Sequence, residues 1–206
     1  MSELKAVLFD IGGVIITSPF EAFAEYERAH GLPTGFIRSL NATNSDDNAW
    51  ARLERNTVTF EEFCRLFETE ARSAGHELDA AAVMRLLAGE IRPEMVTAVR
   101  RCQERLRTAA LTNNFTLPDG DPPMREIREL FDVIVESSRI GVRKPDPRFY
   151  ELACAELGVA PGESVFLDDL GVNLKSARAL GMTTIKVDDP ARAIAELEAI
   201  LGFALR

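Results

Sequence analysis

Short apolar runs recur along the chain and predict buried β-strands. The first run, Ala6 to Phe9, ends at Asp10 and is followed by Gly12 and Gly13. A continuous apolar run of this length, closed by a turn signal, is typical of a strand that is covered on both faces. Later runs predict four further strands, over residues 108–111, 132–135, 164–167 and 183–187.

Between the first two predicted strands, from about residue 18 to about residue 92, apolar residues recur at helical spacing and no strand is predicted. One helix starts at a capping box, Thr59 to Glu62, and a second starts behind Asp79. A third is predicted with Ser18 as its cap and Pro19 in its first position. The apolar positions that define the first two helices are Phe60, Phe63, Phe67 and Ala71, then Val83, Met84, Leu86 and Leu87.

Beyond residue 93 helices alternate with the predicted strands. Helices are expected from Pro93 to about Arg107, from Asp146 to Gly158, up to Gly181, and from Pro190 to Gly202. This alternation predicts an α/β fold in which a parallel sheet carries helices on both faces. The long helical segment then becomes an α-helical cap inserted after the first strand. The expected division is a core of residues 1–16 and 93–206 and a cap of residues 17–92.

Composition narrows the class of protein. The chain has 206 residues and is 46% hydrophobic, which is enough for one domain with an insertion. Its net charge of −9 argues against nucleic acid or an anionic membrane as the main partner. Cys64, Cys102 and Cys154 fall in helical patterns without CxxC spacing, so we expect buried, reduced thiols. No leader or membrane-spanning pattern is present, and a cytoplasmic protein is expected.

Polar residues stand where the predicted strands end. They are Asp10 with Gly12 and Gly13; Thr112, Asn113 and Asn114; Lys144; and the pair Asp168 and Asp169. In open α/β sheets ligands bind beyond the carboxyl ends of the strands, so we expect these side chains to meet. A cluster of carboxylates is tolerable only with a cation nearby.

This combination describes phosphoryl transfer to a carboxylate. Asp10 attacks phosphorus, while a divalent ion is held by Asp10, a backbone carbonyl and one acid of the Asp168–Asp169 pair. Lys144 and the Thr112 hydroxyl hold the phosphoryl oxygens. Because the protein itself is acidic, an anionic substrate needs such local cations.

Each signal alone has a simpler interpretation. Asp10 could merely end a strand, the Asp168–Asp169 pair could cap a helix, and Lys144 could be a solvated lysine. Four such signals in order, each at a strand end, favour a site. In the cap the simpler interpretation is preferred, with aromatic residues as its core and arginines in solvent. The cap residues that could touch a substrate are Phe20, Arg38, Trp50, Arg52 and Glu54.

The four motifs together resemble the haloacid dehalogenase-like hydrolases. The likeness is closest to the branch of the N-terminal phosphatase domain of soluble epoxide hydrolase and of the matching domain of certain acyl-CoA dehydrogenases. It covers essentially the whole chain and implies a Rossmann-like core with an α-helical cap. The motifs are residues 9–14, 111–115, 144–147 and 166–174.

The resemblance also implies roles and a cofactor. Asp10 is then the nucleophile that forms an aspartyl-phosphate, and Lys144 stabilises the phosphoryl group and the carboxylates. The implied Mg²⁺ ligands are Asp10, the Gly12 carbonyl and Asp169, with Asp168 as an outer or alternative ligand and Asn173 supporting that loop. The implied phosphate-binding groups are Thr112, Asn113 and the backbone at Gly12 and Gly13.

One position departs from the family pattern. Most phosphatase members carry a second aspartate, the general acid and base, where this chain has Gly12. General acid–base assistance is typically worth about 10²–10⁴-fold, so ordinary alkyl phosphates should react slowly here. A water molecule, a cap residue or a good leaving group could compensate.

Three functions therefore stay in view. The first is a Mg²⁺-dependent phosphatase acting on a small phosphorylated metabolite. The second is a non-catalytic phosphate- and metal-binding regulatory module, for which Gly12 is the support. The third is a 2-haloacid dehalogenase, against which the Asp168–Asp169 pair argues, because uncompensated carboxylates would repel its substrate. The substrate, the cap residues that select it, and the choice between monomer and homodimer are left open.

Overall fold

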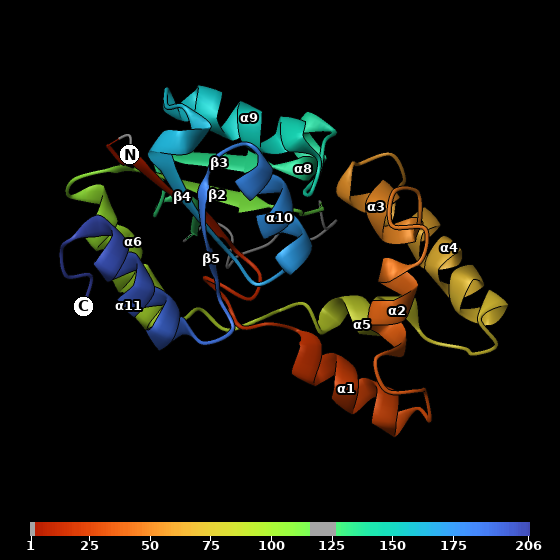
Figure 1. Cartoon of the computed structure of the whole chain (residues 1–206). Helices are drawn as coiled ribbons and strands as arrows, with labels where there is room; N and C mark the ends of the chain where they lie inside the picture. The colour runs from red at the N-terminus through yellow and green to blue at the C-terminus, as the bar shows by residue number, and fades with distance from the viewer. Residues whose placement is uncertain (1–2, 116–126) are drawn as a thin grey trace.

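A parallel sheet of five strands forms the centre of the computed structural model, which describes residues 3–115 and 127–206 (Figure 1). The strands are β1 (Ala6–Asp10), β2 (Arg107–Thr112), β3 (Val133–Glu136), β4 (Ser164–Asp168) and β5 (Thr183–Lys186). Their order is β3-β2-β1-β4-β5, with β1 in the middle. The ends of β1, β2 and β4 therefore lie next to one another at one edge, which we call the sheet edge.

Helices cover both faces of the sheet. The core helices are α6 (Pro93–Gln103), α8 (Ser137–Ile140), α9 (Pro147–Leu157), α10 (Gly171–Ala179) and α11 (Pro190–Leu201), with a 3-10 turn η1 (Pro161–Glu163). Val7 and Phe9 pack with α6 and α11 on one face, whereas Ala6 and Leu8 pack with α9 and α10 on the other. Because both faces are covered, β1 is apolar and buried from Ala6 to Phe9. The predicted Rossmann-like α/β fold is confirmed.

Residues 17–92, here called the helical region, form five helices beside the sheet edge (Figure 1). They are α1 (Phe20–Ala29), α2 (Phe36–Ala42), α3 (Ala49–Glu54), α4 (Phe60–Ser73) and α5 (Ala80–Arg85). The capping box of Thr59 and Glu62 is formed, and Asp79 caps α5 as predicted. These helices share an apolar cluster of their own, separate from the two clusters of the sheet.

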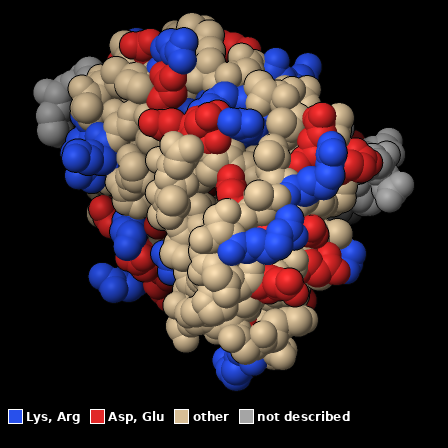
Figure 2. Space-filling model, turned by 90° about the vertical axis from the view of Figure 1, so that its right-hand side faces the viewer, with Lys and Arg blue, Asp and Glu red and all other residues tan. Residues whose placement is uncertain are grey.

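Aromatic rings fill the interior of the helical region. Trp50 makes edge contacts with Phe63 at 5.4 Å and with Phe67 at 5.9 Å between ring centroids, and Phe63 stacks on Phe67. Figure 2 shows the outer face of this region, where acidic and basic side chains lie beside one another between uncharged surface. The helical region is thus a packed body with a mixed-charge exterior.

Two chain segments join the helical region to the core, and they lie side by side. The Thr17 N–H donates to the Glu90 carbonyl at 2.9 Å, and the Arg92 N–H donates to the Ile15 carbonyl at 2.8 Å. Ile16 and Ile91 form an antiparallel bridge between these bonds. We call residues 15–17 and 90–92 the stem. The predicted division has a core of residues 1–16 and 93–206 and a cap of residues 17–92. It stays a prediction, which the stem and the separate apolar cluster support. Residues 1–2 and 116–126 of the predicted core lie outside the described residues.

Some local predictions were wrong. Ser18 does not cap α1: Pro19 holds the cap position without a side-chain bond, and the buried Ser18 hydroxyl has no hydrogen-bond partner among the described residues. The helix from Pro93 ends at Gln103, because Arg107 already pairs as the first residue of β2. The short helices α2, α3 and α8 have too few periodic positions to be read from the sequence.

Two further expectations, buried cysteine thiols and no membrane-spanning segment, can be compared with the structure. Cys102 and Cys154 are buried and Cys64 is partly exposed, and all three are unpaired thiols. Within residues 3–115 and 127–206, no helix combines the length and the apolar character needed to cross a membrane.

Candidate active site

The sheet edge gathers the predicted polar residues. Asp10, Thr112 and Asp168 are the last residues of β1, β2 and β4, and Lys144 lies in the loop between α8 and α9. All four side chains are buried. Because β1 lies between the parallel strands β2 and β4, the ends of these strands bring Asp10, Thr112 and Asp168 together. Lys144 joins them from its loop.

Lys144 connects the two strand-end carboxylates. Its Nζ lies 2.8 Å from Asp10 Oδ1 and 2.8 Å from Asp168 Oδ2. Asp10 Oδ1 also accepts the Ile11 backbone N–H at 2.6 Å. Burial alone would lower the pKa of Lys144, but the two carboxylates outweigh it and raise the pKa. Lys144 is therefore a fixed ammonium ion.

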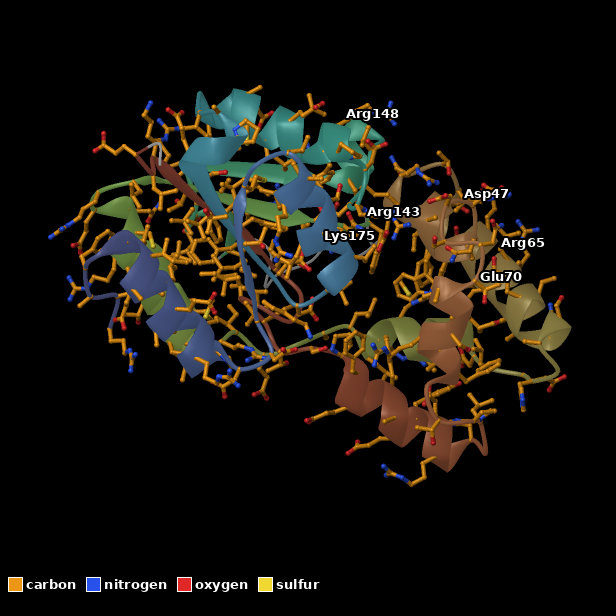
Figure 3. The ribbon with its side chains drawn as sticks, viewed as in Figure 1. Asp47, Arg65, Glu70, Arg143, Arg148 and Lys175 are labelled. Carbon is orange, nitrogen blue, oxygen red and sulfur yellow. The ribbon has the colours of Figure 1, made fainter. Side chains whose placement is uncertain are left out.

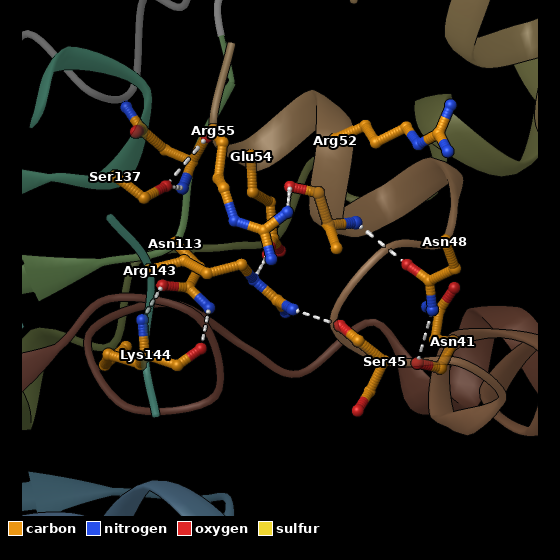
Figure 4. Close-up of polar contacts among 12 residues, drawn as sticks. Asn41, Ser45, Asn48, Arg52, Glu54, Arg55, Asn113, Ser137, Arg143 and Lys144 are labelled. Carbon is orange, nitrogen blue, oxygen red and sulfur yellow. Dashed lines mark hydrogen bonds and ion pairs between the residues drawn. The ribbon is translucent and has the colours of Figure 1, made fainter. Parts of the chain in front are cut away.

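Asn113 holds the backbone of Lys144. Its Nδ2 donates to the Lys144 carbonyl at 3.0 Å, and the Lys144 N–H donates to Asn113 Oδ1 at 2.8 Å. Figure 4 shows both bonds. The side chain that the resemblance assigns to phosphate is thus engaged in positioning Lys144, and its contact with phosphate stays a prediction.

Asp168 is saturated by protein donors. Its Oδ1 accepts the Leu170 N–H at 2.7 Å and Asn173 Nδ2 at 3.1 Å, while Oδ2 accepts Lys144 Nζ and Asn173 Nδ2 at 3.0 Å. The Asn173 carbonyl in turn accepts the Tyr150 hydroxyl at 3.0 Å. These bonds fix the loop after β4, and they leave Asp168 little capacity for a further ligand.

Asp169 faces the glycine turn after β1. A Cβ atom added to Gly13 would overlap the Asp169 carboxylate, and the φ of Gly13 is +74°, a conformation that disfavours other residues. Only glycine allows the turn and this carboxylate to approach so closely. The sequence identified Gly13 for its contact with phosphate, whereas this second constraint could not be read from it.

The three carboxylates form a cluster in which negative charge exceeds positive charge. Oxygen atoms of Asp10, Asp168 and Asp169 lie within 4.8 Å of one another. Burial and the neighbouring Asp168 raise the pKa of Asp169 to about 6. Burial also raises the pKa of Asp10, with Asp168 and Asp169 adding to the effect and Lys144 opposing it.

This cluster fits a divalent cation. Among the described residues, the Lys144 ammonium ion is the cation that pairs with these carboxylates, at Asp10 and Asp168, so that carboxylates are in excess. Hard divalent cations prefer carboxylate and carbonyl oxygens, and they reverse the unfavourable electrostatics of such a site. Asp10 and Asp169 are the members with capacity to bind one, since Asp168 is already saturated.

Gly12 leaves open space at the position of the missing acid. A Cβ atom placed on it would meet no atom within 4 Å. Hence no neighbouring group from the described residues fills the place where the family's second aspartate begins.

A buried network beside the site was not predicted. Glu136, at the end of β3, accepts bonds from Arg128 at 2.6 and 2.9 Å and from Asn114 Nδ2 at 2.7 Å. The Asn114 backbone N–H also donates to the Ser137 hydroxyl at 3.0 Å. These contacts fix the loop that carries Thr112 and Asn113; the available signal was a glutamate at the end of an apolar run.

The candidate substrate-contacting residues of the helical region have structural partners. Trp50 lies in the aromatic interior, and the Arg38 guanidinium covers the Phe20 ring at 4.2 Å from its centroid. Arg52 pairs with Asp47. Glu54 pairs with Arg143 of the core, a contact that the sequence did not reveal.

Comparison with known proteins gives one family. A profile of the haloacid dehalogenase-like hydrolases matches residues 4–181. Mouse (Mus musculus) acyl-CoA dehydrogenase family member 10 is 40% identical and pig (Sus scrofa) bifunctional epoxide hydrolase 2 is 33% identical, each over 98% of this chain. The chain spans 19% and 40% of those two proteins. A sesquiterpene phosphatase of Aspergillus oryzae is 27% identical, with 98% of each chain covered.

Solved structures support the fold. A predicted hydrolase of this family from Porphyromonas gingivalis superimposes with a TM-score of 0.70 at 24% identity, covering 97% of this chain and 98% of that one. A family enzyme from Bacteroides thetaiotaomicron, crystallised with magnesium and inorganic phosphate, gives 0.60 at 18% identity, with 89% and 93% covered.

Proposed function

This chain belongs to the haloacid dehalogenase-like hydrolases, and on that premise we propose that it hydrolyses phosphate monoesters through a phosphorylated Asp10. The observation that carries the proposal is the bridge of Lys144 between Asp10 and Asp168, inside a carboxylate cluster at the strand ends. A buried ammonium ion beside a nucleophilic carboxylate stabilises the charge that develops on a transferred phosphoryl group.

Mg²⁺ is the proposed cofactor, held by Asp10, Asp169 and the Gly12 carbonyl. The uncompensated charge of the cluster supports this choice, as does the related enzyme crystallised with magnesium and phosphate. When bound, the ion neutralises charge on the phosphoryl oxygens. Asp168 remains with Lys144 and Asn173 and serves to hold the ammonium ion in place.

The proposed reaction has two steps. An Asp10 oxygen attacks phosphorus, the bond from phosphorus to the ester oxygen breaks, and that oxygen leaves with the bonding electrons. Water then attacks the aspartyl-phosphate, which releases inorganic phosphate and restores Asp10. Thr112 and Lys144 hold the phosphoryl oxygens. Since Gly12 has no side chain, the departing oxygen takes its proton from water, and leaving-group acidity sets the rate of the first step.

The substrate class proposed is a small phosphorylated metabolite in the cytoplasm, with no role for nucleic acid or membranes. The relative named as a sesquiterpene phosphatase supports phosphate esters as substrates. The acidic net charge of −9 supports the exclusion of polyanionic partners.

A leaving-group series tests the proposal. Purified protein is assayed for phosphate release from acetyl phosphate, p-nitrophenyl phosphate and alkyl phosphates, with and without Mg²⁺, and Asp10→Asn is the control. We expect Mg²⁺-dependent release from the first two, slower release from alkyl phosphates by about 10²-fold or more, and none from Asp10→Asn. Release that persists in Asp10→Asn would refute the mechanism.

The open space at Gly12 favours one alternative, a phosphate- and metal-binding regulatory module. Binding of Mg²⁺ and inorganic phosphate without turnover of any substrate would support it. A 2-haloacid dehalogenase ranks last, because its carboxylate substrate would meet an uncompensated carboxylate cluster. Metal-independent chloride release from 2-chloropropionate would reverse that order.

A further inference from the structure

Arg143 joins the core to the helical region directly beside the proposed catalytic lysine. It precedes Lys144 in the chain, yet its side chain extends away from the sheet edge toward α3, as Figures 3 and 4 show. Only 19% of this side chain is exposed. A long cationic side chain buried at the junction of two bodies needs a specific partner.

Two segments of the helical region supply partners. Arg143 Nε lies 2.5 Å from Oε2 of Glu54, the last residue of α3. Arg143 Nη1 donates to the Ser45 carbonyl at 2.8 Å, in the loop before α3. The Glu54 carboxylate is 13% exposed, and the Nε–H is not aligned on it as a hydrogen bond, so the contact is electrostatic. We call this set of contacts, Arg143 with Glu54 and Ser45, the clasp.

The backbone of Arg143 continues directly into the site through Lys144. One peptide bond separates it from Lys144, whose backbone N–H and carbonyl are both held by Asn113. The Lys144 ammonium then reaches Asp10 and Asp168. A short chain of fixed contacts thus runs from α3 to the nucleophile.

Burial distinguishes this pair from the other charge pairs of the helical region. Arg52 and Asp47 lie 2.8 Å apart, but their side chains are 39% and 63% exposed and both belong to that region. Exposed pairs contribute little to stability, whereas breaking a buried pair leaves a charge without compensation. Burial raises the pKa of Glu54, and the nearby Arg143 guanidinium opposes this rise.

We propose that Arg143 and Glu54 are positioning residues for Lys144: the clasp fixes the helical region against the sheet edge and thereby holds the Lys144 loop in its working position. This role rests on the proposed phosphatase function. It requires no contact of either residue with substrate. A displacement of about 1 Å in a catalytic group can lower a rate by about 10²-fold.

Kinetics with two leaving groups test the role. Glu54→Gln and Arg143→Gln are compared with wild type on acetyl phosphate and p-nitrophenyl phosphate in Mg²⁺, and Arg52→Gln is the matched control. We expect kcat to fall by about 10–10²-fold, by the same factor for both substrates, with KM little changed. The double variant should lose no more than either single variant. Arg143→Lys, which keeps the charge, should recover part of the rate, and Arg52→Gln should keep it.

Hydrogen exchange gives a readout that does not depend on turnover. The amides of residues 143, 144 and 146 should exchange faster in Glu54→Gln than in wild type or Arg52→Gln. If wild type hydrolyses none of the substrates, the exchange measurement still shows whether the clasp holds the Lys144 loop. Failure of the proposed function and failure of the clasp are therefore distinguishable. Glu54→Gln keeps the shape of the side chain and serves if Arg143→Gln does not fold.

Two results would overturn the role. One is unchanged kcat together with unchanged exchange at residues 143, 144 and 146. The other is a loss in Glu54→Gln that is large for p-nitrophenyl phosphate and absent for acetyl phosphate, because such selectivity marks a proton donor rather than a positioning residue.

Discussion

The interior of the sheet edge is made of charged groups, whereas the interior of the helical region is mainly apolar and aromatic. At the edge Asp10, Lys144 and Asp168 are buried and bonded to one another, with carboxylates in excess. In the helical region the interior is aromatic, and a pair such as Arg52 with Asp47 lies in solvent. The edge is thus organised for charge chemistry at the expense of stability, and the helical region for packing.

This difference teaches where each kind of change should act. Loss of a charge at the edge leaves its partner buried without compensation, which affects both chemistry and folding. Loss of a ring in the helical region leaves a cavity, which affects folding alone. Variants in the two regions should therefore separate catalysis from stability.

The largest effect is expected for Lys144→Met. Without the ammonium ion Asp10 and Asp168 repel each other in a buried site, so we expect phosphate release to fall by at least about 10³-fold and stability by about 3–5 kcal/mol. Urea unfolding and steady-state assays measure the two. The stability loss should shrink as the pH falls, because protonated carboxyl groups no longer need the ammonium ion. Lys175→Met, on the exposed side of α10, is the control; equal stability of both variants would contradict the prediction.

Phe63→Ala, in the helical region, should lower stability without changing the sheet edge. Its ring is fully buried between Trp50 and Phe67, so truncation should cost about 3–5 kcal/mol. Mg²⁺ affinity at the sheet edge, measured by titration calorimetry on the folded variant, should stay as in wild type. Phe60→Ala removes a ring at the margin of the same cluster and should cost less. A weakened Mg²⁺ affinity in Phe63→Ala would show that the regions are not separable.

Gly12→Asp sharpens the comparison by adding the missing acid to the edge. Space for a side chain is open there, so we expect about 10²-fold faster hydrolysis of alkyl phosphates and little gain on acetyl phosphate. Gly12→Ala is the control for the backbone change. If Gly12→Asp hydrolyses alkyl phosphates no faster than Gly12→Ala does, a carboxyl group at position 12 does not act as the general acid.

The smallest effect concerns pH and the metal. The raised pKa of Asp169, about 6, means that protons compete with Mg²⁺ for this carboxylate below that pH. Mg²⁺ affinity should therefore hold above pH 6 and fall by about tenfold per pH unit below it. Calorimetric titrations between pH 5 and 8 measure this slope. Asp169→Asn should bind weakly at every pH; an unchanged slope in that variant would assign the proton elsewhere.

Much of the sheet edge could be predicted from the sequence, because the ends of adjacent parallel strands lie at the same edge of the sheet. Once Asp10, Thr112 and Asp168 are placed at strand ends, the geometry of an open α/β sheet brings them together. The cluster needs no knowledge of the intervening chain. Lys144 and the excess of carboxylates follow from the same pattern of polar residues, and the family resemblance then adds a role for each residue.

The contacts between the regions could not be predicted, because nothing in local patterning distinguishes them. Glu54 and Arg143 are ordinary charged residues near helix ends, and only packing decides that this pair is buried while Arg52 and Asp47 are exposed. Asn113 illustrates a second limit, since an amide can bind phosphate or a backbone equally well. Ser18 shows a third: a cap residue followed by proline matched the pattern, but the helix began without it.

The stem allows the helical region to vary independently of the core. Because residues 15–17 and 90–92 bond to each other, everything between them closes as a loop whose ends are already fixed, and its length can change at little cost in closure entropy. The proposed nucleophile, Asp10, lies five residues before Ile15, so we expect its position to stay the same when the length of the helical region changes. We therefore expect that the helical region, cut at the stem, can be replaced by the corresponding segment of a relative, and that such a replacement changes selectivity while Asp10 stays in place. The one condition on the incoming piece is an acid where Glu54 stands, so that Arg143 does not lose its partner.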